Sequence, residues 1–290
     1  MALRSSLERI PNLRPLSAML FGAPSSSSSS LTWDRKDEYR AAVEVASFDG
    51  MGHGLRTTCE ANAGDVLLSV PASLWERYSA HTARTKLEKD APALIERADA
   101  LDERVGLDLD SGASQHALLA LHIVLSFCAG DAYVRSLPRV LHSPTFSRDY
   151  ADGDYSSLPS APLADAVKAR VDFFTRVHAE MGLANSVPFP LFAWGCGTIL
   201  SRAVRMKDAP YTLVPLLDFA NHNSNPNAEL KFSDEDRSFM LVAKAHVGKG
   251  EQAFIDYGSN ANGGNPLGFL LKYGFENNIK YGDQRQQQWE

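Results

Sequence analysis

The spacing of apolar residues changes twice along this chain of 290 residues. Short runs in which apolar and polar residues alternate, the pattern of half-buried strands, occur near both ends. The first group predicts strands over 42–45, 54–58 and 66–70. The second group predicts strands over 213–218, 229–232, 239–243 and 253–256. The turn-forming residues 233–237 predict that the strands on either side of them form a hairpin.

Between these two groups, apolar residues recur at steps of three and four, which indicates helices. The predicted helices cover 115–128, 163–181, 191–206 and, near the C-terminus, 266–273. Gly130, Gly182 and Gly274 follow three of them, and glycine readily takes the left-handed conformation that ends a helix. Strands, a helical insert over about 75–190 and strands again predict an α+β fold.

The composition is that of a globular protein and argues against several other classes of protein. Hydrophobic residues make up 44% of the chain and charged residues 22%. A formal net charge of -6 argues against a surface that grips nucleic-acid phosphates, which needs clustered Lys and Arg. No apolar run reaches the roughly 18 residues of a membrane-spanning helix. The cysteines have no paired spacing, which argues against a zinc cluster and indicates a reducing compartment.

We expect residues 1–33 to lie outside the fold. They carry Arg4, Arg9 and Arg14, one acidic residue, and a run of serines over 25–30. This composition fits either a disordered tail or an organelle transit peptide. The compartment therefore stays open between the cytoplasm or nucleus and an organelle such as a plastid or mitochondrion.

Three glycines at every second position, Gly50, Gly52 and Gly54, mark a loop between two predicted strands. Without a Cβ, such residues let the backbone come close to a ligand. A dinucleotide-binding loop needs G-x-G-x-x-G spacing with a helix directly after it, and this segment has neither. On its own the segment is a tight turn or a ligand-binding loop.

Several polar residues later in the chain also have a structural explanation on their own. Asp218, Asn221 and His222 lead into a turn-rich segment, where side chains commonly bond the local backbone. Arg202 lies near the end of a predicted helix, where a cation complements the helix dipole. Tyr257 follows a predicted strand, where an aromatic ring commonly packs in a core. His222 has no partner His or Cys at ligand spacing, so we expect no metal site.

Taken in chain order, these motifs resemble the active site of the SET-domain protein methyltransferases, in particular the branch that contains the Rubisco large-subunit lysine methyltransferase. The likeness rests on Gly-His-Gly-Leu at 52–55, Ser-Arg-Ala at 201–203, the Asn-His pair at 221–222, the segment 250–258 and Tyr-Gly-Phe at 273–275. It implies a mainly β SET domain of small sheets over 34–277, with a helical insert and a knot-like C-terminal threading. A polar tail over 278–290 would follow.

The resemblance also implies roles for individual residues. The cofactor would be S-adenosylmethionine, bound by Gly52, His53, Gly54, Leu55, Arg202, Asp218, Asn221, His222, Tyr257, Tyr273 and Phe275. The glycine segment would lie along the methionine part of the cofactor, and Arg202 would meet its carboxylate. Asn221 would contact the cofactor through its side chain and His222 through its backbone. Tyr257 would be the catalytic residue, with its hydroxyl at the methyl-transfer channel.

The implied activity is protein-lysine N-methylation. A free lysine amine has a pKa near ~10.4, so it must lose a proton before it can accept a methyl group. Enclosing that amine between aromatic rings lowers its pKa by desolvation. We expect a protein substrate, a non-histone protein in preference to a histone, and a monomeric enzyme that binds neither nucleic acid nor a membrane.

Two alternatives stay open beside lysine methylation. A member of the same branch methylates a protein histidine, and a SET-like domain can also serve as a binding module without activity. Members of the branch normally continue into a helical domain that docks the protein substrate, where this chain has only the polar tail. We therefore expect either a fragment or a different way of recognising the substrate, and the substrate protein and methylation state stay undefined.

Overall fold

The computed structural model describes residues 40–104, 112–139, 141–146, 155, 158, 160–206, 209–258 and 266–275. The predicted tails, 1–33 and 278–290, lie outside this part of the chain. Its strands are β1 (Arg40–Ala41), β2 (Val43–Phe48), β3 (Gly52–Thr57), β4 (Val66–Pro71), β5 (Val204–Met206), β6 (Ala209–Thr212), β7 (Asn221–His222), β8 (Ala228–Ser233), β9 (Ser238–Ala243) and β10 (Gln252–Ile255).

Most of the helices lie between β4 and β5. They are α3 (Ala72–Trp75), η2 (Glu76–Tyr78), α4 (Ala80–Asp90), α5 (Pro92–Arg104), α6 (Ala113–Ala129), α7 (Ala132–Ser136), η3 (Pro144–Phe146), α8 (Ala161–Glu180) and α9 (Phe189–Arg202). The 3-10 helix η5 (Leu217–Phe219) and α10 (Pro266–Tyr273) follow later in the chain.

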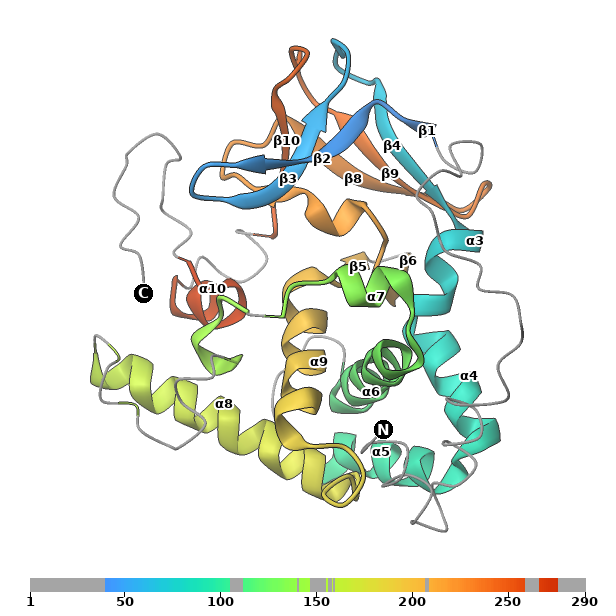
Figure 1. Cartoon of the computed structure of the whole chain (residues 1–290), viewed down its shortest axis with the longest axis vertical. Coiled ribbons are helices and arrows are strands. Elements are labelled where there is room, and N and C mark those ends of the chain that lie inside the picture. Colours follow the sequence, from blue (N-terminus) through green and yellow to red (C-terminus); the bar gives the residue numbers. More distant parts are fainter. Residues whose placement is uncertain are drawn as a thin grey trace.

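The two larger sheets lie at one end of the molecule and most helices at the other, with β5 and β6 beside α7 between them, as Figure 1 shows. One four-stranded sheet has the order β1-β4-β9-β8, another has the order β2-β3-β10-β7, and β5 pairs with β6. Buried residues from both larger sheets, including Leu55, Leu68, Phe239 and Ile255, form one hydrophobic core. The alternating pattern of the sequence thus places one face of each sheet in a shared interior.

The helical layer is built around α6, which lies among α4, α5 and α9 (Figure 1). The ten residues of α6 from His116 to Leu125 are all buried, so this helix has no solvent-exposed side over that length. Gly130 ends it with a φ of 92°, as the sequence predicts. A third, smaller core joins Leu271 of α10 to Leu163 and Val167 of α8.

The chain passes beneath its own C-terminal segment at β7. This strand pairs in parallel with β10, with Asn221 opposite Phe254 and His222 opposite Ile255. The rings of Phe269 and Phe275 then lie 5.0 and 6.1 Å from the ring of His222. The fold class predicted from the sequence is confirmed, with small sheets, helices between them and the Asn-His segment covered by later residues.

Two element predictions were wrong, and both errors fall next to the site. The helix predicted over 191–206 ends at Arg202, because Ala203 is extended and the following residues pair with β6. The strand predicted over 213–218 is a buried turn that leads into η5. Leu216 takes a φ of 70° there, and Asp218 donates its backbone N–H to Val214. A short buried apolar run has the same composition in a strand and in a turn of this kind.

Candidate active site

Residues far apart in the sequence meet where β3, β10 and β7 lie side by side. The Asn221 side chain on β7 donates an N–H to the carbonyl oxygen of His53 on β3, with an Nδ2–O distance of 3.1 Å. This bond uses the amide nitrogen and leaves Oδ1, the acceptor, on the other side of the amide. The predicted glycine segment and the predicted Asn-His pair are therefore held together directly.

The predicted segment 52–55 divides between backbone and core roles. Leu55 is 1% exposed and packs in the β core, so only its backbone can face a ligand. Gly52 has a φ of 69° and open space where a Cβ would stand. At Gly54 a Cβ would overlap the Gln252 amide and lie 2.8 Å from Nδ2 of Asn221. A side chain at Gly54 would therefore have to displace the amide ends of Gln252 and Asn221.

Arg202, the last residue of α9, contacts η5. Its Nη1 lies 3.2 Å from Oδ2 of Asp218 and 3.0 Å from the Asp218 carbonyl oxygen. The Asp218 side chain is fully buried, whereas that of Arg202 is 22% exposed. Burial raises the pKa of Asp218 to about 6, and the charge of Arg202 opposes this rise. Tyr133 lies beside the same carboxylate, without a hydrogen bond of ordinary geometry.

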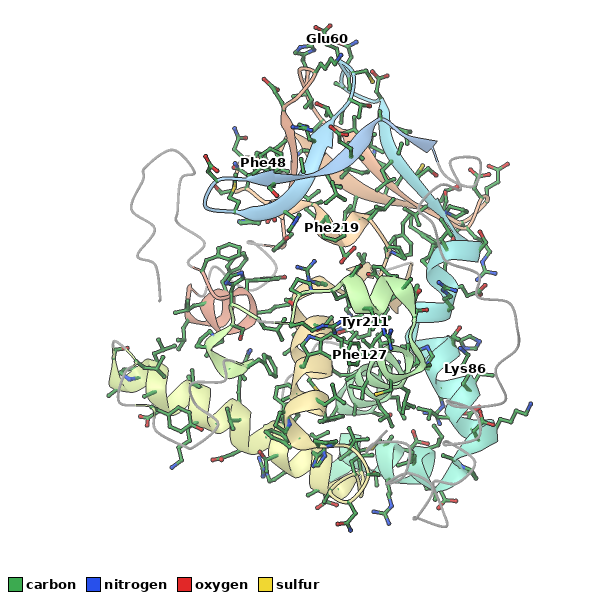
Figure 2. All side chains as sticks on the ribbon, viewed as in Figure 1. Phe48, Glu60, Lys86, Phe127, Tyr211 and Phe219 are labelled. Atoms are coloured by element: carbon green, nitrogen blue, oxygen red, sulfur yellow. The ribbon has the colours of Figure 1, made fainter. Side chains whose placement is uncertain are left out.

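Asp218 was predicted among the residues that contact the cofactor. In the structure its carboxylate is buried and contacts residues of the protein. It holds Arg202, whose guanidinium carbon lies 5.8 Å from the centre of the Phe219 ring. The ring of Phe219 in turn lies 6.4 Å from that of His53. Figure 2 places Phe219 between the strands and the helical layer. Arg202 is thus fixed beside the glycine segment, where its partly exposed cation can meet an anion.

Tyr257 is fixed at both its side chain and its backbone. Its hydroxyl donates to the carbonyl oxygen of Ala220 at 2.8 Å, and its backbone N–H donates to Nδ1 of His222 at 3.2 Å. The hydroxyl of Tyr273 reaches the carbonyl oxygen of Tyr257 at 3.4 Å. The phenol that the sequence predicts as catalytic is therefore held at the residue before Asn221.

Aromatic rings close around this phenol. The aromatic wall consists of His222, Tyr257, Phe269, Tyr273 and Phe275. Ring centres lie 4.8 Å apart for Tyr257 and Tyr273, and 4.6 Å apart for Phe269 and Tyr273. Tilted and edge contacts at such separations stabilise aromatic clusters. The wall is thus one continuous aromatic surface beside the Tyr257 hydroxyl.

The helical layer holds α10 and the residues directly after it, which carry Phe269, Tyr273 and Phe275 of the aromatic wall. Ser143 donates its hydroxyl to the carbonyl oxygen of Leu271 at 2.6 Å in a buried position. Gly274 ends α10 with a φ of 84°, and a Cβ there would overlap the carbonyl oxygen of His142. The helical insert therefore holds the segment that carries these aromatic residues.

The sequence reasoning missed three residues that the structure brings to the site. Phe219 touches both Arg202 and His53, Phe269 packs on His222, and Gln252 lies against Gly54. Phe219 lies between two predicted site residues, which is a usable signal. Phe269 and Gln252 lie in a helix and a strand whose patterns indicate only packing.

In the part of the chain that the structure describes, no group of three or more His, Cys, Asp or Glu residues could hold a metal ion. Within the same residues, no helix has both the length and the apolar character to cross a membrane.

The family model described as the SET domain matches residues 52–258, which include both the glycine segment and Tyr257. The chain belongs to the SET-domain family. S-adenosylmethionine is the methyl donor of the methyltransferases in this family, as the resemblance predicts.

Two curated relatives of this SET domain are similar over part of their length. SET domain-containing protein 4 of Artemia parthenogenetica is 24% identical over 263 residues, which cover 84% of this chain and 61% of the relative. The ribosomal lysine N-methyltransferase set10 of Schizosaccharomyces pombe is 27% identical over 158 residues, 49% of this chain and 27% of that protein. The matched part of this chain thus spans less than two thirds of either relative.

Solved structures share the fold. The SET domain of LSMT bound to methyl-lysine and AdoHcy has a TM-score of 0.63 at 21% identity, covering 85% of this chain and 56% of that one. Rubisco LSMT bound to AdoMet has a TM-score of 0.59 at 19% identity, covering 82% of this chain and 52% of that one. The predicted likeness to the Rubisco-enzyme branch is confirmed at the level of the fold.

Proposed function

We propose that this SET domain is an S-adenosylmethionine-dependent protein-lysine N-methyltransferase, with Tyr257 as its catalytic residue. The observation that carries the proposal is the bond of the Tyr257 hydroxyl to the Ala220 carbonyl oxygen at 2.8 Å, inside the aromatic wall and next to the Asn-His segment. A phenol held in this way presents its oxygen in a fixed place, which is what orienting a reacting group requires.

The residues around the glycine segment fit the cofactor chemically. Arg202 supplies a guanidinium for a carboxylate, and Oδ1 of Asn221 supplies an acceptor for an amine. The absence of a side chain at Gly54 lets this strand keep its contact with Asn221. The bound cofactor supplies a methyl group activated on a sulfonium. Binding by these residues brings it within reach of the aromatic wall.

The aromatic wall suits a lysine side chain as the acceptor. Aromatic faces attract an ammonium group, so the wall can bind the charged form first. An amine bound against these rings loses contact with water, and this desolvation lowers its pKa and favours its neutral form. The hydroxyl of Tyr257 and the carbonyl oxygen of Ala220 can then orient the amine. No carboxylate base is needed for this.

A protein substrate fits the proposal, because one relative is named for methylating ribosomal lysine and the neighbouring structures hold lysine or methyl-lysine. We propose a non-histone protein as the substrate. A histidine acceptor differs from a lysine acceptor in the identity of the modified residue, so product analysis separates the two directly.

The test is transfer of a labelled methyl group from S-adenosylmethionine to proteins of a cell extract, followed by mass spectrometry of the labelled peptides. We expect label on lysine with the wild-type protein. Label on histidine would replace the substrate class and keep the enzyme. No transfer, together with a thermal melt that millimolar cofactor does not move, would contradict both the activity and the cofactor site.

A further inference from the structure

Gln252, the first residue of β10, has a buried side-chain amide. The residue is only 6% exposed. Among the described residues, neither Nε2 nor Oε1 of its side chain has a hydrogen-bond partner. The backbone of Gln252 is bonded, since its carbonyl oxygen accepts an N–H from Asn227 at 2.9 Å. Buried amides are almost always hydrogen-bonded, so the isolation of this side chain needs an explanation.

The position of this amide connects it to the site. β10 lies between β3 and β7, so Gln252 belongs to the strand that joins the glycine segment to the Asn-His pair. A Cβ at Gly54 would overlap Nε2 of Gln252, lie 2.8 Å from Nδ2 of Asn221 and lie 3.0 Å from the ring of Phe48. The Gln252 and Asn221 amides therefore converge above the same glycine, and the ring of Phe48 on β2 also lies close to that position.

The two amides complement each other once the terminal group of Gln252 is turned by half a rotation. Such a turn exchanges nitrogen and oxygen within nearly the same outline. It places a carbonyl oxygen where Nε2 stands, on the side of Gly54 where the amide nitrogen of Asn221 also lies. That nitrogen has two N–H groups, and one already bonds the His53 carbonyl oxygen.

We propose that Gln252 is a positioning residue that accepts the second N–H of Asn221. With both N–H groups held by His53 and Gln252, Oδ1 of Asn221 has one direction left, away from the sheet. Gln252 then acts on the ligand only through Asn221. This inference rests on the proposed function, because the ligand at Oδ1 is the amino-acid end of S-adenosylmethionine.

Loss of Gln252 should weaken only ligands that carry the amino-acid end of the cofactor. S-adenosylhomocysteine carries the amino-acid end, whereas 5′-methylthioadenosine carries the nucleoside and thioether without it. Gln252→Met keeps the length of the side chain and removes its polar atoms. We expect it to weaken S-adenosylhomocysteine roughly tenfold to a hundredfold in Kd, as the loss of one oriented hydrogen bond does, and to change 5′-methylthioadenosine little.

Titration calorimetry on four proteins tests this: wild type, Gln252→Met, Asn221→Ala and the double variant. Because Gln252 acts through Asn221, the double variant should bind S-adenosylhomocysteine as weakly as Asn221→Ala alone. Additive losses, or equal losses for the two ligands, would overturn the inference. An unchanged Kd for Gln252→Met would also overturn it and indicate that buried water satisfies the amide.

Two further variants keep the result interpretable. Thr57→Val removes a buried hydroxyl of β3 that bonds Gly248 at 2.6 Å, and it should lower the melting temperature without changing either Kd. Gly54→Ala leaves both amides intact and inserts a methyl group between them, so it should cause the same selective loss even if Gln252→Met does not fold. A wild type that binds neither ligand contradicts the proposed function instead.

Discussion

The guanidinium of Arg202 and the carboxylate of Asp218 form a partly buried ion pair, at an Nη1–Oδ2 distance of 3.2 Å. The carboxylate is fully buried, while 22% of the arginine side chain is exposed. Both contacts to Asp218 use Nη1, and the guanidinium also carries N–H groups at Nε and Nη2. The pair therefore holds the arginine in place and leaves it able to attract a second anion.

Removing Arg202 should destabilise the protein more than removing a surface arginine. Arg202→Met leaves Asp218 buried without its cation, and we expect the free energy of unfolding to fall by about 2–3 kcal/mol. Arg56→Met is the matched control, since Arg56 and Glu44 are 46% and 51% exposed and such pairs contribute within about 1 kcal/mol. Urea denaturation of both variants measures the difference. Equal losses would show that the Asp218 pair is no stronger than a surface pair.

The raised pKa of Asp218 predicts a pH dependence of stability with a defined sign. The folded protein binds this proton up to about pH 6, whereas the usual value is 3.8. Stability falls with rising pH wherever the folded state binds more protons, so this contribution is lost between pH 3.8 and about 6.

Asp218→Asn should remove that dependence. Relative to the variant, the wild type should lose on the order of 3 kcal/mol of unfolding free energy across this pH range. Denaturation of both proteins at pH values below and above the range measures it. Parallel curves would mean that Asp218 titrates as an ordinary carboxyl group.

The end of α10 offers a test of how the helical layer supports the aromatic wall. Gly274→Ala places a Cβ against the carbonyl oxygen of His142 and strains a φ of 84°. Gly250→Ala strains a similar φ of 87° in open space, so it isolates the backbone cost of about 1–2 kcal/mol. We expect both variants to melt earlier and only Gly274→Ala to weaken cofactor binding, by calorimetry. Unchanged binding in Gly274→Ala would show that the wall does not depend on this contact.

The sequence predicted elements correctly where capping or turn residues mark their ends. Pro266 and Gly274 bound α10 as expected, and the turn after Ser233 joins β8 to β9 as a hairpin. The strand predicted over 213–218 failed because burial there serves a turn that brings Asp218 under α9. Its apolar composition is compatible with either structure.

The sequence predicted residues that the structure brings together, and it did not predict their contacts. The motifs pointed to Arg202, Asn221 and Tyr257, whose surroundings follow from a family resemblance. That Asp218 turns inward to Arg202 depends on the end of α9, which the helical periodicity placed four residues too late. The burial of Gln252 depends on β3 and β7 joining β10 from opposite sides, which no local pattern records.

Removing the hydroxyl of Tyr257 separates an enzyme from a binding module. Tyr257→Phe keeps the ring in the aromatic wall and loses the bond to the Ala220 carbonyl oxygen, so stability should fall by only about 1 kcal/mol. Turnover should fall by ~10²–10³-fold, because the amine loses its oriented partner. Tyr211→Phe, whose hydroxyl lies 3.3 Å from Nδ1 of His116 in the helical layer, controls for losing a phenolic hydroxyl elsewhere. Methyl incorporation is measured at matched cofactor occupancy. Equal rates in the wild type and Tyr257→Phe would remove Tyr257 from the catalytic site.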